Sequence, residues 1–235
     1  MTSPNLTKSN TLPELLRDRA EDPHSPAQLG FLGADGEATR SLSLAELYRD
    51  SVDYASRLLA AGLSPTDVVL ASFPDHESHI RLFWACCLAG IPFCPLPALH
   101  PDASRQTLLF NHLQSLFHRP TLITLPETAQ SIRLLAPDLK ILEPQTLPEG
   151  TGHTSHVFPT RIPSPDDTVC FMLTSGSTGN SKAVLLRHSN FLSSVRGKIL
   201  HHNTSSSSRF LNWIAFDHVA CLSEIHIHAI EANAR

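Results

Sequence analysis

The sequence predicts an α/β fold in which mainly parallel sheets are flanked by helices. Segments with apolar residues at helical spacing alternate along the chain with short apolar runs that are typical of buried strands. A helix between two strands allows both strands to run in the same direction, so the sheets should be largely parallel. The 235 residues, 41% hydrophobic and 17% charged, suffice for one large domain or two small ones. We expect a first α/β subdomain over residues 1–143, a proline-rich connector over 144–167, and the incomplete start of a second subdomain over 168–235.

The best-defined element of the first subdomain is a helix over residues 44–59. Ser43 and Glu46 have the spacing of a capping box, and Gly62 follows the last turn. The other expected elements are, in order, a strand at 67–73, a helix from Asp75 to Gly90, an extended segment at 91–97, a helix at 102–117, a strand at 121–125, a short helix at 129–135 and a strand at 139–142.

The second subdomain is expected to contain, in order, a strand at 168–174, a strand at 182–186, a helix from Ser189 or Asn190, a strand at 209–216 and a helical segment to about residue 230. Phe210 and Trp213 fall on the last of these strands, where aromatic residues usually belong to the core. The long apolar stretch at 82–99 contains three prolines, so we expect a buried helix leading into a strand and not a membrane span.

Composition excludes several classes of function. The formal net charge of −4, without a basic block, disfavours nucleic-acid binding. The five cysteines include no C-x-x-C pair, so we expect buried free thiols instead of disulfides or a zinc site. The first 23 residues lack the apolar core of a secretory signal. A cytoplasmic protein without membrane attachment is expected.

The segment TSGSTGNSK, residues 174–182, carries the strongest chemical signal. Glycines let the backbone turn successive N–H groups toward one point, hydroxyl side chains add donors, and the final lysine adds a positive charge, which together suit phosphate oxygens. A solvated turn is the alternative for such a composition. The P-loop pattern G-x-x-x-x-G-K-[ST] does not fit, because these glycines lie only three residues apart and the lysine opens a β-rich run.

This segment resembles the phosphate-binding signature of the adenylate-forming (AMP-binding) superfamily of acyl-CoA synthetases, luciferases and adenylation domains. SLSLAELY, LAGIPFCPLP and RFLNWIAFDHVACLSEIH resemble further segments of that family in the same order. The FDHV variant is most similar to fungal nonribosomal peptide synthetase-like enzymes of secondary metabolism. The resemblance implies the N-terminal portion of the large domain of an adenylate-forming enzyme, and the family's later residues do not occur in this sequence.

The resemblance further implies ATP with Mg²⁺ as cofactor, a carboxylic acid as substrate, and CoA or a phosphopantetheine carrier as possible acyl acceptor, with the magnesium ligand expected outside this sequence. By motif match, the β- and γ-phosphates would be held by Thr174, Ser175, Gly176, Ser177, Thr178, Gly179 and Lys182. The acyl pocket would include Phe216, Asp217 and His218. For Asp217 a second interpretation stays open, because an Asp after a strand often caps the next helix.

The sequence also allows other interpretations. Glu224, His226 and His228 could converge on a metal if their segment were a strand, whereas the favoured helix would separate them. For the whole chain, an adenylating enzyme stands beside two alternatives. One is a catalytically incompetent remnant or accessory nucleotide-binding fragment, expected to expose apolar edges, and the other is a chain that a separate C-terminal half complements.

Overall fold

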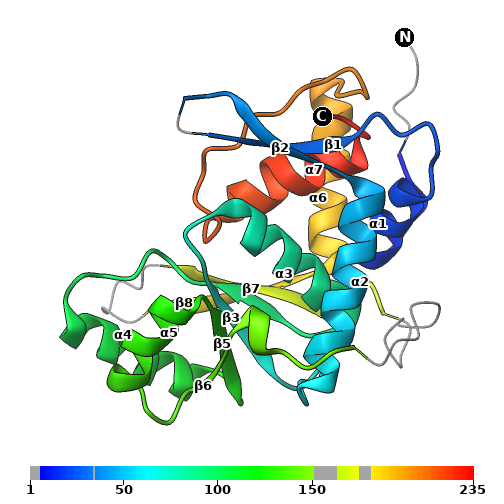
Figure 1. The fold of residues 1–235 in the computed structure, drawn as a ribbon. Coiled ribbons are helices and arrows are strands. Elements are labelled where there is room, and N and C mark those ends of the chain that lie inside the picture. The colour runs from blue at the N-terminus through cyan, green and yellow to red at the C-terminus, as the bar shows by residue number, and fades with distance from the viewer. Residues whose placement is uncertain (1–5, 34, 151–162, 175–180) are drawn as a thin grey trace.

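The computed structural model describes residues 6–33, 35–150, 163–174 and 181–235. They form a six-stranded sheet with helices on both faces, and a separate two-stranded hairpin beside the C-terminal helical segment (Figure 1). The predicted α/β architecture with a mostly parallel sheet is confirmed.

The sheet has the strand order β6-β5-β3-β4-β7-β8. Its strands are, in that order, Lys140–Leu142, Pro120–Thr124, Val68–Ser72, Phe93–Pro95, Thr168–Thr174 and Lys182–Arg187. Neighbouring strands run parallel except β7 and β8, which form an antiparallel pair. β4 and β7 pair at Phe93 and Cys170, so strands from both sides of the proline-rich connector share one sheet. The subdomain boundaries at residues 143 and 168 remain a prediction.

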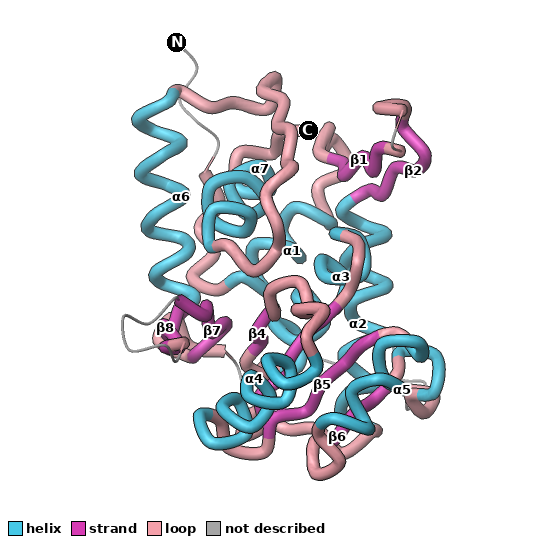
Figure 2. The backbone as a smooth tube through the Cα atoms, turned by 90° about the vertical axis from the view of Figure 1, so that its left-hand side faces the viewer, coloured by secondary structure: helices cyan, strands magenta, loops and turns pink. Residues whose placement is uncertain are grey.

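Two layers of helices cover the two faces of this sheet (Figure 2). Side chains alternate along β3, so Val69 and Ala71 join one buried cluster while Val68 and Leu70 join another. Helices α1 (Leu12–Ala20), α2 (Leu44–Ala60), α3 (His76–Ala89) and α6 (His188–His202) contribute to the first cluster. Helices α4 (Ala103–Leu116) and α5 (Pro126–Leu135) contribute to the second.

Helix starts and ends follow the local sequence signals. Ser43 Oγ accepts a hydrogen bond from the Glu46 backbone N–H over 3.2 Å, and Glu46 Oε2 accepts one from the Ser43 N–H over 2.9 Å. Asp75 caps α3, which ends at Gly90 with φ +68°. The predicted capping box and both predicted helices are therefore confirmed. Among the described residues, no helix has the length and apolar character needed to cross a bilayer.

Three elements near the N-terminus were not predicted from the sequence. Helix α1 begins with a capping box between Thr11 and Glu14, the same signal that identified α2. Strands β1 (Gln28–Leu32) and β2 (Ala38–Ser43) form an antiparallel hairpin. Five residues of β2 are at least partly exposed, and exposed strands lack the continuous apolar run used to find the others.

The connector is fixed to the first layer over its described part. It begins with a 3₁₀ turn, η1 (Pro144–Thr146). The Arg57 guanidinium of α2 donates hydrogen bonds to the carbonyl oxygens of Pro144, Leu147 and Pro148 over 2.8, 3.3 and 3.4 Å. A single α2 side chain therefore positions the chain where it leaves β6.

The strand predicted over residues 209–216 is wrong. Pairing there is limited, in the described structure, to one position: the Phe210 N–H donates to the Arg235 carbonyl over 2.7 Å, and the Arg235 N–H donates to Ser208 over 3.2 Å. These two bonds have the pattern of a parallel ladder, but one position does not make a strand. Trp213 is 78% exposed, so its predicted place in the core is also wrong.

The chain after this segment is helical, as predicted. A π-helical segment, η2 (Ala220–His226), continues into α7 (Ile227–Glu231). Phe210 is half-buried and packs against a small cluster formed by Ile199, Ala232 and Ala234. All five cysteines are buried and free, which confirms the expected thiols.

Candidate nucleotide and acyl site

Thr174 and Lys182 frame the predicted phosphate loop. Thr174 is the last residue of β7, Lys182 is the first of β8, and the two lie opposite each other in the antiparallel register. Thr174 Oγ1 donates a hydrogen bond to the Lys182 carbonyl over 3.4 Å, and both residues are exposed. The other predicted phosphate ligands, Ser175, Gly176, Ser177, Thr178 and Gly179, lie outside the described residues. The hairpin thus brings a hydroxyl and an ammonium group to one end of the sheet.

A histidine from another part of the chain contacts the exit of this loop. His112 Nε2, on α4, lies 2.7 Å from the carbonyl oxygen of Ser181. Because a carbonyl oxygen can only accept a hydrogen bond, Nε2 carries the proton and is the donor. The sequence gives no signal for this contact, since 69 residues separate the partners.

The expected acyl-pocket residues occupy different environments. Phe216 is 3% exposed, and its ring stacks on His79 with centroids 4.9 Å apart and an interplanar angle of 17°. Asp217 is partly exposed and His218 is exposed. The proposed N-cap role of Asp217 is wrong, because the residue at the cap position of η2 is Val219, without a side-chain cap hydrogen bond.

His79 supports Phe216 from the first turn of α3. Its Nδ1 lies 2.9 Å from the Asp75 carbonyl, so Nδ1 carries the proton. Nε2 is buried and has no hydrogen-bond partner among the described atoms. Burial lowers the pKa of His79, and the hydrogen bond to Asp75 opposes that change. His79 is therefore held neutral beside Phe216.

The sheet brings the two parts of the predicted site to one region. Phe216 contacts Phe93 with ring centroids 6.1 Å apart, and Phe93 pairs with Cys170 on β7. Cys170 precedes Thr174 by four residues, about 13 Å along a strand. In open α/β sheets ligands bind outside the carboxyl ends of the strands, and Thr174 lies at that end of β7.

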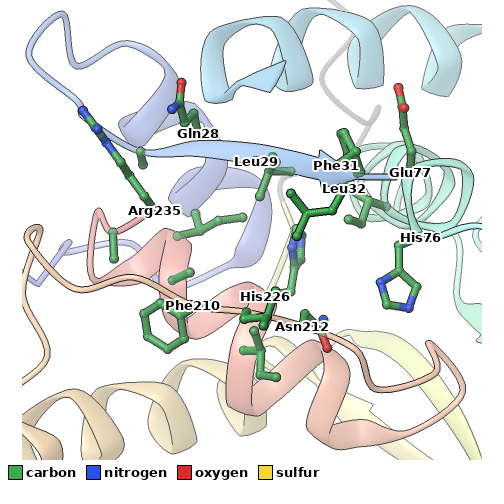
Figure 3. A pocket seen from close by; sticks show the side chains of 18 of the residues that line it. Gln28, Leu29, Phe31, Leu32, His76, Glu77, Phe210, Asn212, His226 and Arg235 are labelled. Atoms are coloured by element: carbon green, nitrogen blue, oxygen red, sulfur yellow. The ribbon is translucent and has the colours of Figure 1, made fainter. Parts of the chain in front are cut away.

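A cavity of about 790 Å³ lies between β1, the start of α3, residues 209–212 and the C-terminal helical segment (Figure 3). Arg235 lies at one end of the cavity, and His76 and Glu77 lie at the other (Figure 3). The described members of the predicted phosphate and acyl site do not line this cavity. It is a separate feature of the fold.

Glu224, His226 and His228 each have a different partner. Glu224 forms an ion pair with Lys198 over 2.5 Å, His226 Nε2 accepts a hydrogen bond from the Trp84 indole over 2.8 Å, and His228 Nε2 lies 3.0 Å from Thr204 Oγ1. The helical conformation expected for this segment, instead of the strand that a metal site would need, is confirmed.

The chain belongs to the AMP-binding enzyme family, whose model matches residues 17–231.

Curated proteins similar to this chain include several from fungi. Microperfuranone synthase of Emericella nidulans is 36% identical over 196 residues, 80% of this chain and 20% of that protein. Nonribosomal peptide synthetase acyN of Ascocoryne sarcoides is 32% identical over 239 residues, 96% of this chain and 24% of that protein. Inactive atromentin synthetase invA6 of Paxillus involutus is 34% identical over 191 residues, 80% of this chain and 20% of that protein. The chain spans a quarter or less of the length of these relatives.

Solved structures agree on the fold. The McyG A-PCP structure, complexed with phenylalanyl-adenylate, matches with a TM-score of 0.83 and 22% identity over 98% of this chain and 41% of that chain. The fatty acid AMP ligase of Legionella pneumophila matches with a TM-score of 0.81 and 19% identity over 97% of this chain and 39% of that chain. The fold is that of the N-terminal portion of adenylation domains, as predicted.

Proposed function

We propose that this chain takes part in the ATP-dependent activation of a carboxylic acid as an acyl-adenylate, in fungal secondary metabolism and in the cytoplasm. The observation that carries the proposal is the register of the β7–β8 hairpin, in which Thr174 faces Lys182 across the ends of TSGSTGNSK. Membership of the AMP-binding enzyme family supports the same chemistry.

In this proposal a carboxylate oxygen attacks the α-phosphorus of ATP, and the bond to the bridging oxygen breaks to release pyrophosphate. The phosphate ligands are Thr174, Ser175, Gly176, Ser177, Thr178, Gly179 and Lys182. Of these residues the structure describes Thr174 and Lys182. Their exposed hydroxyl and ammonium groups lie on adjacent strand ends and suit the oxygens of a polyphosphate. Lys182 stabilises the charge that develops on the leaving pyrophosphate. Mg²⁺ accompanies ATP, and we assign no residue of this chain to it.

Phe216, Asp217 and His218 are proposed to border the acyl group. Phe216 is fixed by its stacking on His79, which leaves Asp217 and His218 as the exposed polar members of this segment. The acyl acceptor would be the thiol of CoA or of a phosphopantetheine carrier domain. The relative named a nonribosomal peptide synthetase and the neighbour described as A-PCP favour the carrier.

A second candidate is a nucleotide-binding chain without turnover of its own, either a remnant or one that a separate C-terminal half completes. One relative, 34% identical, is itself named inactive. The chain spans 20–24% of the length of these relatives.

ATP–pyrophosphate exchange by the purified chain, across a panel of amino, aryl and fatty acids, tests the proposal. Exchange with at least one acid, lost in Lys182→Ala and retained in Lys140→Ala, would support an adenylating enzyme. Lys140 is a suitable control because it is also an exposed lysine at the start of a strand, β6. A folded chain without exchange for any acid, but with ATP binding, would favour the second candidate.

A further inference from the structure

We propose that His112 is a positioning residue for Lys182, because α4 holds the backbone from which the lysine side chain extends toward the phosphate site. The expected effect on ATP binding rests on the proposed function, but the effect of His112 on the backbone at Lys182 can be tested without ATP. The carrying observation is the 2.7 Å contact between His112 Nε2 and the carbonyl oxygen of Ser181, the residue directly before Lys182.

β8 needs such support because it is an edge strand. The sheet order ends with β7-β8, so among the described residues β8 pairs with one neighbour, β7. Four of its six residues are exposed, including Val184 and Leu185 at 45% and 42%. Lys182 sits at the first position of this strand, where backbone hydrogen bonds fray most easily. The peptide unit before Lys182 is held to another element by His112.

α4 is itself fixed to the sheet close to that point. Phe110 and Leu113 of α4 are buried in the cluster against which Leu173 and Ala183 pack. Those two residues neighbour Thr174 and Lys182 at the loop ends. Phe117, directly after α4, contacts Phe171 of β7 with ring centroids 5.0 Å apart. His112 therefore projects from a helix whose position relative to β7 and β8 is already set.

The chemistry of the contact makes a clear distinction between substitutions. Gln places its amide nitrogen near the position of a histidine Nε2 and can donate to the Ser181 carbonyl. Asn is shorter and cannot reach as far. His112→Gln should therefore retain the function of the native residue, and His112→Asn should lose it. His118→Asn is the control, since His118 is exposed two residues beyond the end of α4.

The test combines amide hydrogen exchange with a MgATP titration of the purified chain. We expect His112→Asn to speed exchange at Lys182 and Ala183 and to weaken MgATP binding by about three- to tenfold, the value of one hydrogen bond. His112→Gln and His118→Asn should match the native chain in both measurements, and the urea midpoint of His112→Asn should stay close to the native value.

Two results would overturn the inference. One is unchanged exchange at Lys182 in His112→Asn, and the other is a general rise in exchange over α4 and β7 with a lowered urea midpoint, which indicates a merely structural role. A third result separates the two proposals. If the native chain does not bind MgATP while His112→Asn speeds amide exchange at Lys182 and Ala183 alone, the positioning role stands and the proposed function fails.

Discussion

The indole Nε1 of Trp84 donates a hydrogen bond to Nε2 of His226 over 2.8 Å, with both side chains buried. The bond joins α3 to the last residue of η2, 142 positions further along the chain. Since Nε2 accepts, the proton of the neutral imidazole is on Nδ1. α3 also carries His79 beneath Phe216, so one helix holds both ends of the segment that contains Asp217.

Replacing Trp84 by Phe should destabilise the chain by about 1–3 kcal/mol, because the buried His226 Nε2 would lose its donor. The measurement is urea unfolding followed by far-UV circular dichroism. Trp213→Phe is the matched control, because Trp213 is 78% exposed, and it should change stability by no more than about 0.5 kcal/mol. Equal effects of the two substitutions would contradict the structure.

Stability should fall as the pH is lowered from 7 toward 5. Burial lowers the pKa of His226 to about 3 and that of His188 to about 4, from an unfolded value of about 6.5. Below about pH 6.5 the unfolded chain therefore binds more protons than the folded one, and stability present above that pH is lost. Each histidine adds up to about 1.4 kcal/mol per pH unit.

The pH dependence can be assigned with His226→Gln, whose Oε1 can accept the Trp84 hydrogen bond but does not titrate. Urea unfolding at several pH values between 7 and 5 gives the change in the free energy of unfolding with pH. For this variant that slope should be smaller than the native one by an amount that corresponds to about one proton. His118→Gln, at an exposed site, is the control for stability and should leave the urea midpoint at pH 7 unchanged. A native slope retained in His226→Gln would show that His226 is not responsible.

Glu231 connects the two ends of the chain. It is fully buried, pairs with Arg196 over 2.8 Å, and accepts a hydrogen bond from Thr7 Oγ1 over 2.7 Å. Glu231→Ala should lower the free energy of unfolding by about 3 kcal/mol or more, because the partly buried guanidinium of Arg196 loses its counter-charge. Glu224→Ala, which breaks the more exposed pair with Lys198, should cost about 1 kcal/mol or less. Thermal or urea unfolding distinguishes the two.

Two glycines should respond oppositely to replacement by alanine. A Cβ at Gly150 would lie 1.9 Å from Ser56 Oγ, so Gly150→Ala must displace the connector or Ser56 and should destabilise by about 1–3 kcal/mol. Gly197 lies within α6 with no atom in the way, so Gly197→Ala should stabilise by about 0.5–1 kcal/mol. The same sign for both variants in urea unfolding would contradict this packing.

Local signals in the sequence were sufficient for most of the fold. The capping box at Ser43 and the cap at Asp75 act within one helical turn, so α2 and α3 could be predicted without tertiary information. The strand over 209–216 could not be judged in this way, because β-propensity becomes a strand only where a neighbour pairs with it. Trp213 was misplaced for the same reason.

The candidate site divides in a similar way. The phosphate signature is contiguous, so its residues could be named from the sequence. The structure adds that Thr174 and Lys182 lie opposite each other across the β7–β8 hairpin. His112 and His79 could not be found, because each contacts its site segment across more than 60 residues. Only the three-dimensional packing of α3 and α4 reveals them.

We propose that Lys182 and the hairpin around it bind the phosphates of ATP. The most direct measurement is a calorimetric titration of the purified chain with MgATP, repeated for Lys182→Ala and for the control Lys140→Ala. We expect the native chain to bind MgATP, Lys182→Ala to weaken that binding by about 10- to 100-fold, and Lys140→Ala to leave it unchanged. Native affinity in Lys182→Ala, or no binding by a folded chain, would contradict this proposal.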